Sequence, residues 1–166
     1  MPPRVRKGAL TLHVAFSVGW IGAAGGYVAI ALAGLTSRDA EVVRAAYLTM
    51  ELIAWQVLVP LSLGSLVSGL VSSLGTTWGL FRHYWVLFKL LLNLVATAVL
   101  LGYAQSIGHI ADVAAQPTWS SADLDVLRNS THVIHSTGGL LVLLTALVLA
   151  VYKPRGTTPY GQRGAP

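Results

Sequence analysis

Four long apolar segments constrain this chain more than any other feature of its sequence. They run over about residues 9–35, 47–74, 85–107 and 131–152. A helix needs about 20 apolar residues to cross the roughly 30 Å hydrocarbon layer of a bilayer, and each segment is long enough. Only 10% of the residues are charged, whereas a soluble domain carries about a quarter. The sequence therefore predicts an all-α fold, an integral membrane four-helix bundle that forms a single domain over residues 1–153.

The charged residues are distributed unequally over the two ends of the predicted bundle. One end carries basic residues and no acidic residue: Arg4, Arg6, Lys7, Arg82, Lys89, Lys153, Arg155 and Arg163. The other end carries both signs: Arg38, Asp39, Glu41, Arg44, Asp112, Asp123, Asp125 and Arg128. Because Lys and Arg accumulate on the cytoplasmic side, both termini are predicted to be cytoplasmic, in what we expect to be a bacterial cytoplasmic membrane. Residues 154–166, rich in Gly and Pro, are predicted to form a disordered cytoplasmic tail.

Local signals predict where two helices begin and where one is distorted. Thr36 with Asp39, and Ser120 with Asp123, have the S/T-x-x-D spacing of capping boxes, so we expect the second and fourth helices to start there. Pro60 lies in the middle of the second segment and removes a backbone donor. We expect a kink at this point, with the freed carbonyl satisfied by a neighbouring serine or a facing helix.

The composition excludes several classes of function. The chain has no cysteine, which removes disulfides, thiolate-bound metals, iron–sulfur clusters and covalently attached c-type haem. Met1 and Met50 are its only methionines, too few for a Met-rich copper(I) path. The formal net charge of +5 lies at the membrane flanks, as expected for a membrane protein, and we expect no nucleic-acid partner.

Helical periodicity gives each segment a polar or small face. The first segment has two such faces, one with His13, Ser17, Trp20, Ala24, Tyr27 and Ala31, the other with Ala15, Gly19, Gly22, Gly26, Ala29 and Ala33. The second segment gathers Glu51, Trp55, Leu58, Ser62, Ser65, Gly69 and Ser72 on one face, and the third gathers Lys89, Asn93, Ala96 and Tyr103. Small residues on such a face allow close helix approach or leave room for a flat ligand. The fourth segment gathers Arg128, His132, His135, Gly139 and Val142. Because all four segments have such a face, the sequence predicts one compact bundle.

The ionisable residues of the basic end suggest a site for an anion. His13, Arg82, His83 and Lys89 lie there without an acidic residue. Because an ionisable residue within a membrane is energetically costly, each of them is a candidate functional residue. Haem propionates or lipid phosphates are the anions available to Lys89; alternatively, Lys89 extends to lipid headgroups. His13 is the best candidate for a haem iron ligand, and either His83 or a histidine of the other end is the candidate for a second ligand. Alternatively, His13 makes a hydrogen bond to a serine or a backbone carbonyl across a helix interface.

The other end has its own group of ionisable residues. His132 and His135 are three residues apart on one helical face, and Glu51 is placed to face them. This spacing suits a metal site, a proton relay or a second haem, and histidine-only ligands suit copper(II). Alternatively, the two histidines form an interfacial pair partly in water. His109 follows Gly108 near a helix end and is expected to be solvated.

Several short motifs together resemble two groups of small helical membrane proteins, the HemJ-type membrane protoporphyrinogen oxidases and the copper-resistance protein D type of membrane domain. The motifs are His13 seven residues before Trp20, then Gly22; Met50-Glu51; Trp85 four residues before Lys89; and Val151-Tyr152-Lys153-Pro154. They cover most of the chain. The resemblance implies a shared fold, haem b bound at His13 and an ionic role for Lys89.

Three hypotheses of function follow. In the first, the bundle binds haem b for electron transfer or a quinone-linked redox step, with Lys89 and Arg82 meeting the propionates and Trp20, Tyr27 and Trp85 packing on the ring. In the second, His132, His135 and Glu51 handle a metal ion such as copper. In the third, the chain is a non-catalytic accessory subunit, in a homo-oligomer or a larger membrane complex, whose small-residue faces pack against partner helices.

Overall fold

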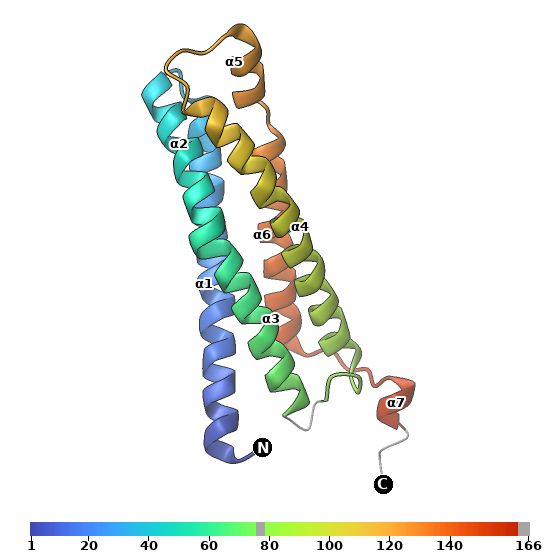
Figure 1. Cartoon of the computed structure of the whole chain (residues 1–166). Helices are drawn as coiled ribbons and strands as arrows, with labels where there is room; N and C mark the ends of the chain where they lie inside the picture. The colour runs from blue at the N-terminus through green and yellow to red at the C-terminus, as the bar shows by residue number, and fades with distance from the viewer. Residues whose placement is uncertain (76–78, 163–166) are drawn as a thin grey trace.

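A computed structural model describes residues 1–75 and 79–162 and confirms the all-α four-helix bundle. The long helices are α1 (Pro3–Thr36), α4 (Tyr84–Ala114) and α6 (Thr131–Tyr152), together with α2 (Ala40–Ile53), which continues through a π-helical turn at Ala54–Leu58 into α3 (Val59–Leu74). Two short helices, α5 (Ser121–Leu127) and α7 (Pro159–Gln162), complete the described part. The elements run side by side as an elongated bundle with both termini at the same end (Figure 1). We call this the terminal end, and the end that carries α5 the opposite end.

The surface of the bundle is apolar along most of its length. Four helical stretches are long and apolar enough to cross a membrane: Pro3–Thr36, Ala40–Leu74, Tyr84–Ala114 and Ser121–Tyr152. Only 6% to 28% of the residues in their most apolar windows are buried inside the protein, so most of this apolar surface faces outward. A water-soluble protein rarely exposes so much contiguous apolar surface. The fold is therefore compatible with an integral membrane protein whose solvent is lipid.

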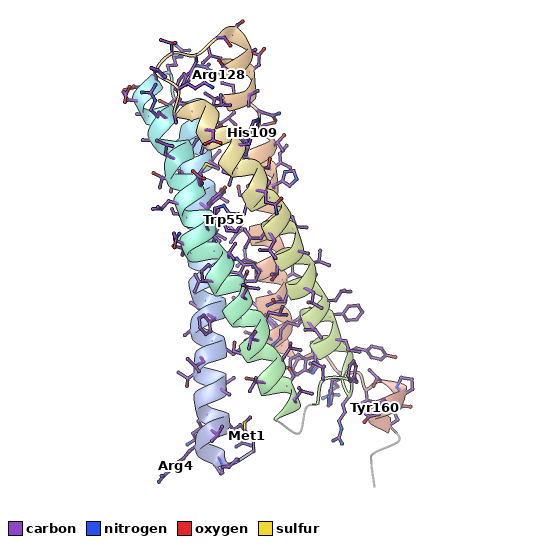
Figure 2. The ribbon with its side chains drawn as sticks, in the orientation of Figure 1. Met1, Arg4, Trp55, His109, Arg128 and Tyr160 are labelled. Atoms are coloured by element: carbon purple, nitrogen blue, oxygen red, sulfur yellow. The ribbon has the colours of Figure 1, made fainter. Side chains whose placement is uncertain are left out.

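The core runs along the middle of the bundle and is richest toward the opposite end. Its largest fully buried side chains include Tyr47, Met50, Ile107 and Leu127. Figure 2 shows Arg128 and His109 near the opposite end, and Arg4 and Tyr160 at the terminal end. Other core residues, among them Trp20, Tyr27 and Leu143, also line the cavities described below.

The backbone around Pro60 departs from a regular α-helix, as the sequence predicts. Proline cannot donate to the carbonyl four residues earlier, and its ring crowds that carbonyl. The helix widens into a π-turn just before Pro60, where the amide of Val59 donates to the carbonyl of Ala54, five residues back. The hydroxyl of Ser62 donates to the carbonyl of Val59 at 2.8 Å, so this serine does not take a carbonyl that Pro60 leaves free.

One of the two predicted capping boxes is confirmed and the other is wrong. The hydroxyl of Ser120 accepts from the amide of Asp123, whose carboxylate accepts from the amide of Ser120. This box starts the separate helix α5, and α6 begins only at Thr131. Thr36 instead ends α1, where its hydroxyl donates to Leu32, and Asp39 caps α2 by accepting from the amide of Glu41 at 2.9 Å.

The start of the C-terminal tail, for which the sequence predicts disorder, folds back onto the bundle. Thr157 forms an antiparallel bridge with His83, and the amide of Thr158 donates to the carbonyl of Arg82 at 2.9 Å. Helix α7 follows immediately (Figure 1). These bonds attach the tail to the turn before α4. The remainder of the predicted disordered segment, residues 163–166, lies outside the described residues.

Candidate functional site

A cavity of about 610 Å³ lies between α1, α3, α4 and α6 near the terminal end. We call it the basic cavity because its lining includes Arg6, Lys7, Lys89 and Lys153. No Asp or Glu is among the described residues that line it. The sequence explains this absence, since residues 1–38, 52–111 and 126–166 contain no acidic residue. Lys89 is half-buried and the other three cations are exposed, so positive charge surrounds the cavity and attracts an anion.

His13 lines the basic cavity and is held by α3. Its Nδ1 lies 3.1 Å from the carbonyl oxygen of Ser65 and 3.2 Å from the hydroxyl of Ser68. A carbonyl oxygen can only accept, so the Nδ1–H donates to Ser65 and the neutral ring keeps its lone pair on Nε2. Nε2 has no hydrogen-bond partner within the described residues. The predicted hydrogen bond across the helix interface is thus confirmed. The same bond fixes the orientation of the ring, and histidines that bind a metal through one ring nitrogen usually have the other nitrogen held in this way.

Two glycines of α3 let α1 approach closely beside this histidine. A Cβ on Gly69 would lie 2.9 Å from Cε1 of His13, and a Cβ on Gly64 would lie 2.6 Å from the ring of Phe16. Both distances are shorter than real Cβ contacts. The predicted role of small residues in the second segment, close helix approach, is therefore confirmed at Gly69. Gly64 and Ser68 lie outside the predicted face, so periodicity alone missed them.

A polar network behind His13 connects three helices. Buried Ser65 shares a hydrogen bond with Ser17 at 2.9 Å and accepts from the side-chain amide of Asn93 at 3.1 Å. The side-chain oxygens of Asn93 and Ser72 are buried without a partner among the described residues, and both residues line the cavity. Because buried polar atoms are normally hydrogen-bonded, these two oxygens are ready to interact with polar groups of a ligand or with water.

Lys89 projects from α4 into the same cavity. Its Nζ lies 5.6 Å from the ring centroid of Trp85, one helical turn earlier, a separation typical of a cation–π contact. Both residues line the basic cavity, as does the buried Trp20 of α1. The structure thus brings together four residues of the predicted haem site: His13, Trp20, Trp85 and Lys89.

Three other residues of the predicted haem site lie elsewhere. Arg82 and His83 stand in the turn before α4, where their backbone groups pair with the C-terminal tail, and neither lines the basic cavity. Tyr27 lines a different cavity farther along α1. The sequence could not place these residues, because the path of the tail and the boundary between the two cavities are tertiary features.

The second cavity, of about 350 Å³, lies between α1, α4 and α6 in the middle of the bundle. We call it the apolar cavity, since Val, Leu, Ile, Ala, Gly and aromatic side chains make up most of its lining. Trp20 and Leu143 line both cavities and separate them. The hydroxyl of Tyr27, which also lines the apolar cavity, is buried without a partner within the described part of the chain.

The histidines near the opposite end belong to an aromatic cluster. His132 is buried, with its Nδ1 hydrogen-bonded to the hydroxyl of Tyr103 and its ring edge-on to Tyr47 at 5.5 Å between centroids. The hydroxyl of Tyr47 donates to the carbonyl of Leu127. His135 stacks on Tyr103, 5.2 Å between centroids and 10° between planes. The contact between Tyr47 and His132 could not be predicted, because the two residues lie in different segments and neither segment carries a signal for it.

The predicted metal site does not form a cluster. Among the described residues, no group of three or more His, Asp or Glu side chains is placed to hold a metal ion. Glu51 lies against Gly108 of α4, with its Oε1 3.4 Å from the position of a Cβ at that glycine. The Nδ1 of His135 is 2.9 Å from the carbonyl of Thr131 in its own helix. Metal binding by Glu51, His132 and His135 stays a prediction.

Comparison with known proteins does not assign a function to this chain. No protein-family model, curated protein or solved structure matches the chain. The functional proposal therefore depends on the two cavities and the residues that line them.

Proposed function

We propose that this chain is an integral membrane protein that binds haem b in the basic cavity for electron transfer, with His13 as the iron ligand. The observation that carries the proposal is His13 itself, which stands in a cationic cavity with Nδ1 tied to Ser65. Its Nε2 is the atom that binds iron. In this proposal both termini lie in the cytoplasm, because the terminal end carries the excess of basic residues, and the membrane is a bacterial cytoplasmic membrane.

The chemistry of the cavity fits this group. Its volume of about 610 Å³ lies within the range of about 300–1,000 Å³ found for ligand sites. Lys89, Arg6 and Lys7 can neutralise propionates without competition from a carboxylate in the described lining. Trp20 and Trp85 offer flat apolar surfaces for the macrocycle. The partnerless hydroxyl of Ser72 can donate to a propionate, and the partnerless Oδ1 of Asn93 can accept from water beside it.

When bound, haem b supplies a one-electron couple. The residues of the chain supply orientation and environment: Ser65 holds the His13 ring, Lys89 balances negative charge, and the apolar helices exclude water. His13 is the one histidine among the described residues that line the cavity. One protein ligand is therefore assigned to the iron.

The test is an absorption spectrum of protein purified after haem-replete expression. The wild type should show a Soret band. In His13→Ala the band per protein should fall at least tenfold and be partly restored by added imidazole. This size is expected because loss of a ligand should cost at least as much affinity as loss of a group that supports a ligand, which costs about 10- to 100-fold. Lys89→Gln should weaken haem binding severalfold. His109→Ala is the control and should bind normally. A wild-type protein without a Soret band overturns the proposal.

A second candidate, the accessory subunit, is favoured by the outward side of α1. Added Cβ atoms on Gly22 and Gly26 would meet no atom within 4 Å, so these two glycines lie on the side of α1 that faces away from the bundle. Glycines four residues apart allow transmembrane helices to associate closely. Cross-linking in membranes tests this role. The wild type should give a homo-oligomer or a hetero-complex, and Gly22→Leu and Gly26→Leu should abolish it. A wild-type protein that stays monomeric, like the variants, would exclude the role.

A further inference from the structure

The apolar cavity has a polar feature that packing alone does not explain. Tyr27 is 3% exposed, yet its hydroxyl makes no hydrogen bond with any described residue. The other hydroxyls of the lining are engaged, that of Tyr103 with His132 and that of Ser136 with the carbonyl of His132 at 2.7 Å. Among the described residues of the lining, Tyr27 is thus the one with a fully buried polar atom that has no hydrogen-bond partner.

The cavity opens sideways between α4 and α6. Three of its lining residues, Val95, Val99 and Ile134, are 50%, 52% and 64% exposed. Val95 and Val99 lie near the middle of α4 and Ile134 in the first turn of α6, and all three belong to stretches long and apolar enough to span a membrane. A molecule would therefore enter from the lipid layer, and it must be soluble there.

The walls of the cavity suit a flat ring. The rings of Trp20, Tyr27 and Tyr103 line one part, and Gly138 and Gly139 of α6 line another. A Cβ on either glycine would meet no atom within 4 Å, so the space in front of them is open. Water is a poor occupant, since a buried water usually needs two to four polar partners.

We propose that the apolar cavity binds a lipid-soluble quinone, with a ring carbonyl accepting a hydrogen bond from Tyr27 and the apolar tail leaving between α4 and α6. A hydrocarbon chain would fill the space but leave the Tyr27 hydroxyl unpaired. A ring carbonyl satisfies it while the remainder of the molecule stays apolar. This binding goes beyond the proposed haem site and does not depend on it, although Trp20 and Leu143 place the two ligands next to each other.

The proposal is tested by titrating the purified full-length protein in lipid nanodiscs with a decyl-substituted benzoquinone. Binding is followed by quenching of tryptophan fluorescence, since Trp20 lines the cavity. Saturable quenching is expected in the wild type. Tyr27→Phe keeps the ring and should weaken binding by about 2- to 10-fold, the loss expected for one hydrogen bond. Tyr152→Phe removes an exposed hydroxyl outside both cavities and should leave the affinity unchanged.

A second pair of variants separates cavity binding from partitioning into lipid. Gly139→Leu should fill the cavity and abolish saturable quenching, whereas Gly102→Leu, also facing open space but outside the lining, should not. Decylbenzene should compete poorly. Equal competition by decylbenzene, or equal affinity of the wild type and Tyr27→Phe, would overturn the proposal in favour of a lipid tail. A Soret spectrum of the same samples separates this outcome from failure of the haem site.

Discussion

The basic cavity and the apolar cavity are neighbours in one bundle, share Trp20 and Leu143, and have opposite chemistry. The lining of the first includes an asparagine, serines and several cations, while that of the second is mostly aromatic, aliphatic and glycine residues, with His135, Ser136 and the partnerless hydroxyl of Tyr27 among its few polar groups. The difference teaches that depth along a helix, as well as its face, sets the chemistry of a membrane site. On α4, Lys89 and Asn93 face the basic cavity, and Ala96 and Tyr103 on the same predicted face line the apolar one.

The glycines of the two cavities differ in the space in front of them, and substituting them should give the largest difference in stability between two variants. In Gly69→Ala, the new methyl group would crowd His13, so we expect a loss of about 1–3 kcal/mol of stability from overpacking and displacement of the imidazole. In Gly138→Ala, the methyl group enters open space, and we expect a gain of about 0.5–1 kcal/mol from helix propensity. Thermal unfolding in detergent and haem titration measure both. Equal behaviour of the two variants would refute the contrast.

An intermediate effect is expected from Tyr103→Phe, which alters the wall of the apolar cavity and the buried His132. The change removes a hydrogen bond and leaves the Nδ1 of His132 unpaired, which should cost about 1–3 kcal/mol. Haem binding in the basic cavity should be unaffected, because Tyr103 does not line it. Tm and the Soret band per protein report the two properties separately. A simultaneous loss of haem would show that the cavities are coupled through more than Trp20 and Leu143.

The smallest effect is expected from Ser72→Ala in the basic cavity. Removing a buried hydroxyl that has no partner among the described residues should raise the stability of the ligand-free protein by up to about 1 kcal/mol. Haem affinity should fall slightly, since the ligand loses a polar contact. A drop in ligand-free Tm would instead indicate that the hydroxyl is already satisfied.

Much of the fold could be predicted from the sequence. Hydrophobic segment lengths predicted the four long helices, and Ser120 with Asp123 formed the predicted capping box. Helical periodicity placed His13 with Trp20, and Lys89 with Asn93, on faces that the structure turns inward. These predictions succeeded because they rest on interactions within one helix or on the thickness of the lipid layer, both of which are local properties of a sequence.

The site itself was decided by the tertiary structure. The contact between His13 and Ser65 joins residues 52 positions apart, and the cluster of Tyr47, Tyr103 and His132 joins three helices. His83 and Arg82 were expected beside the haem, but the returning C-terminal tail holds their backbone. By itself the sequence determined which residues share a helical face. The register and rotation of one helix against another, set by steric fits such as Gly69 on His13, decided which of those faces meet.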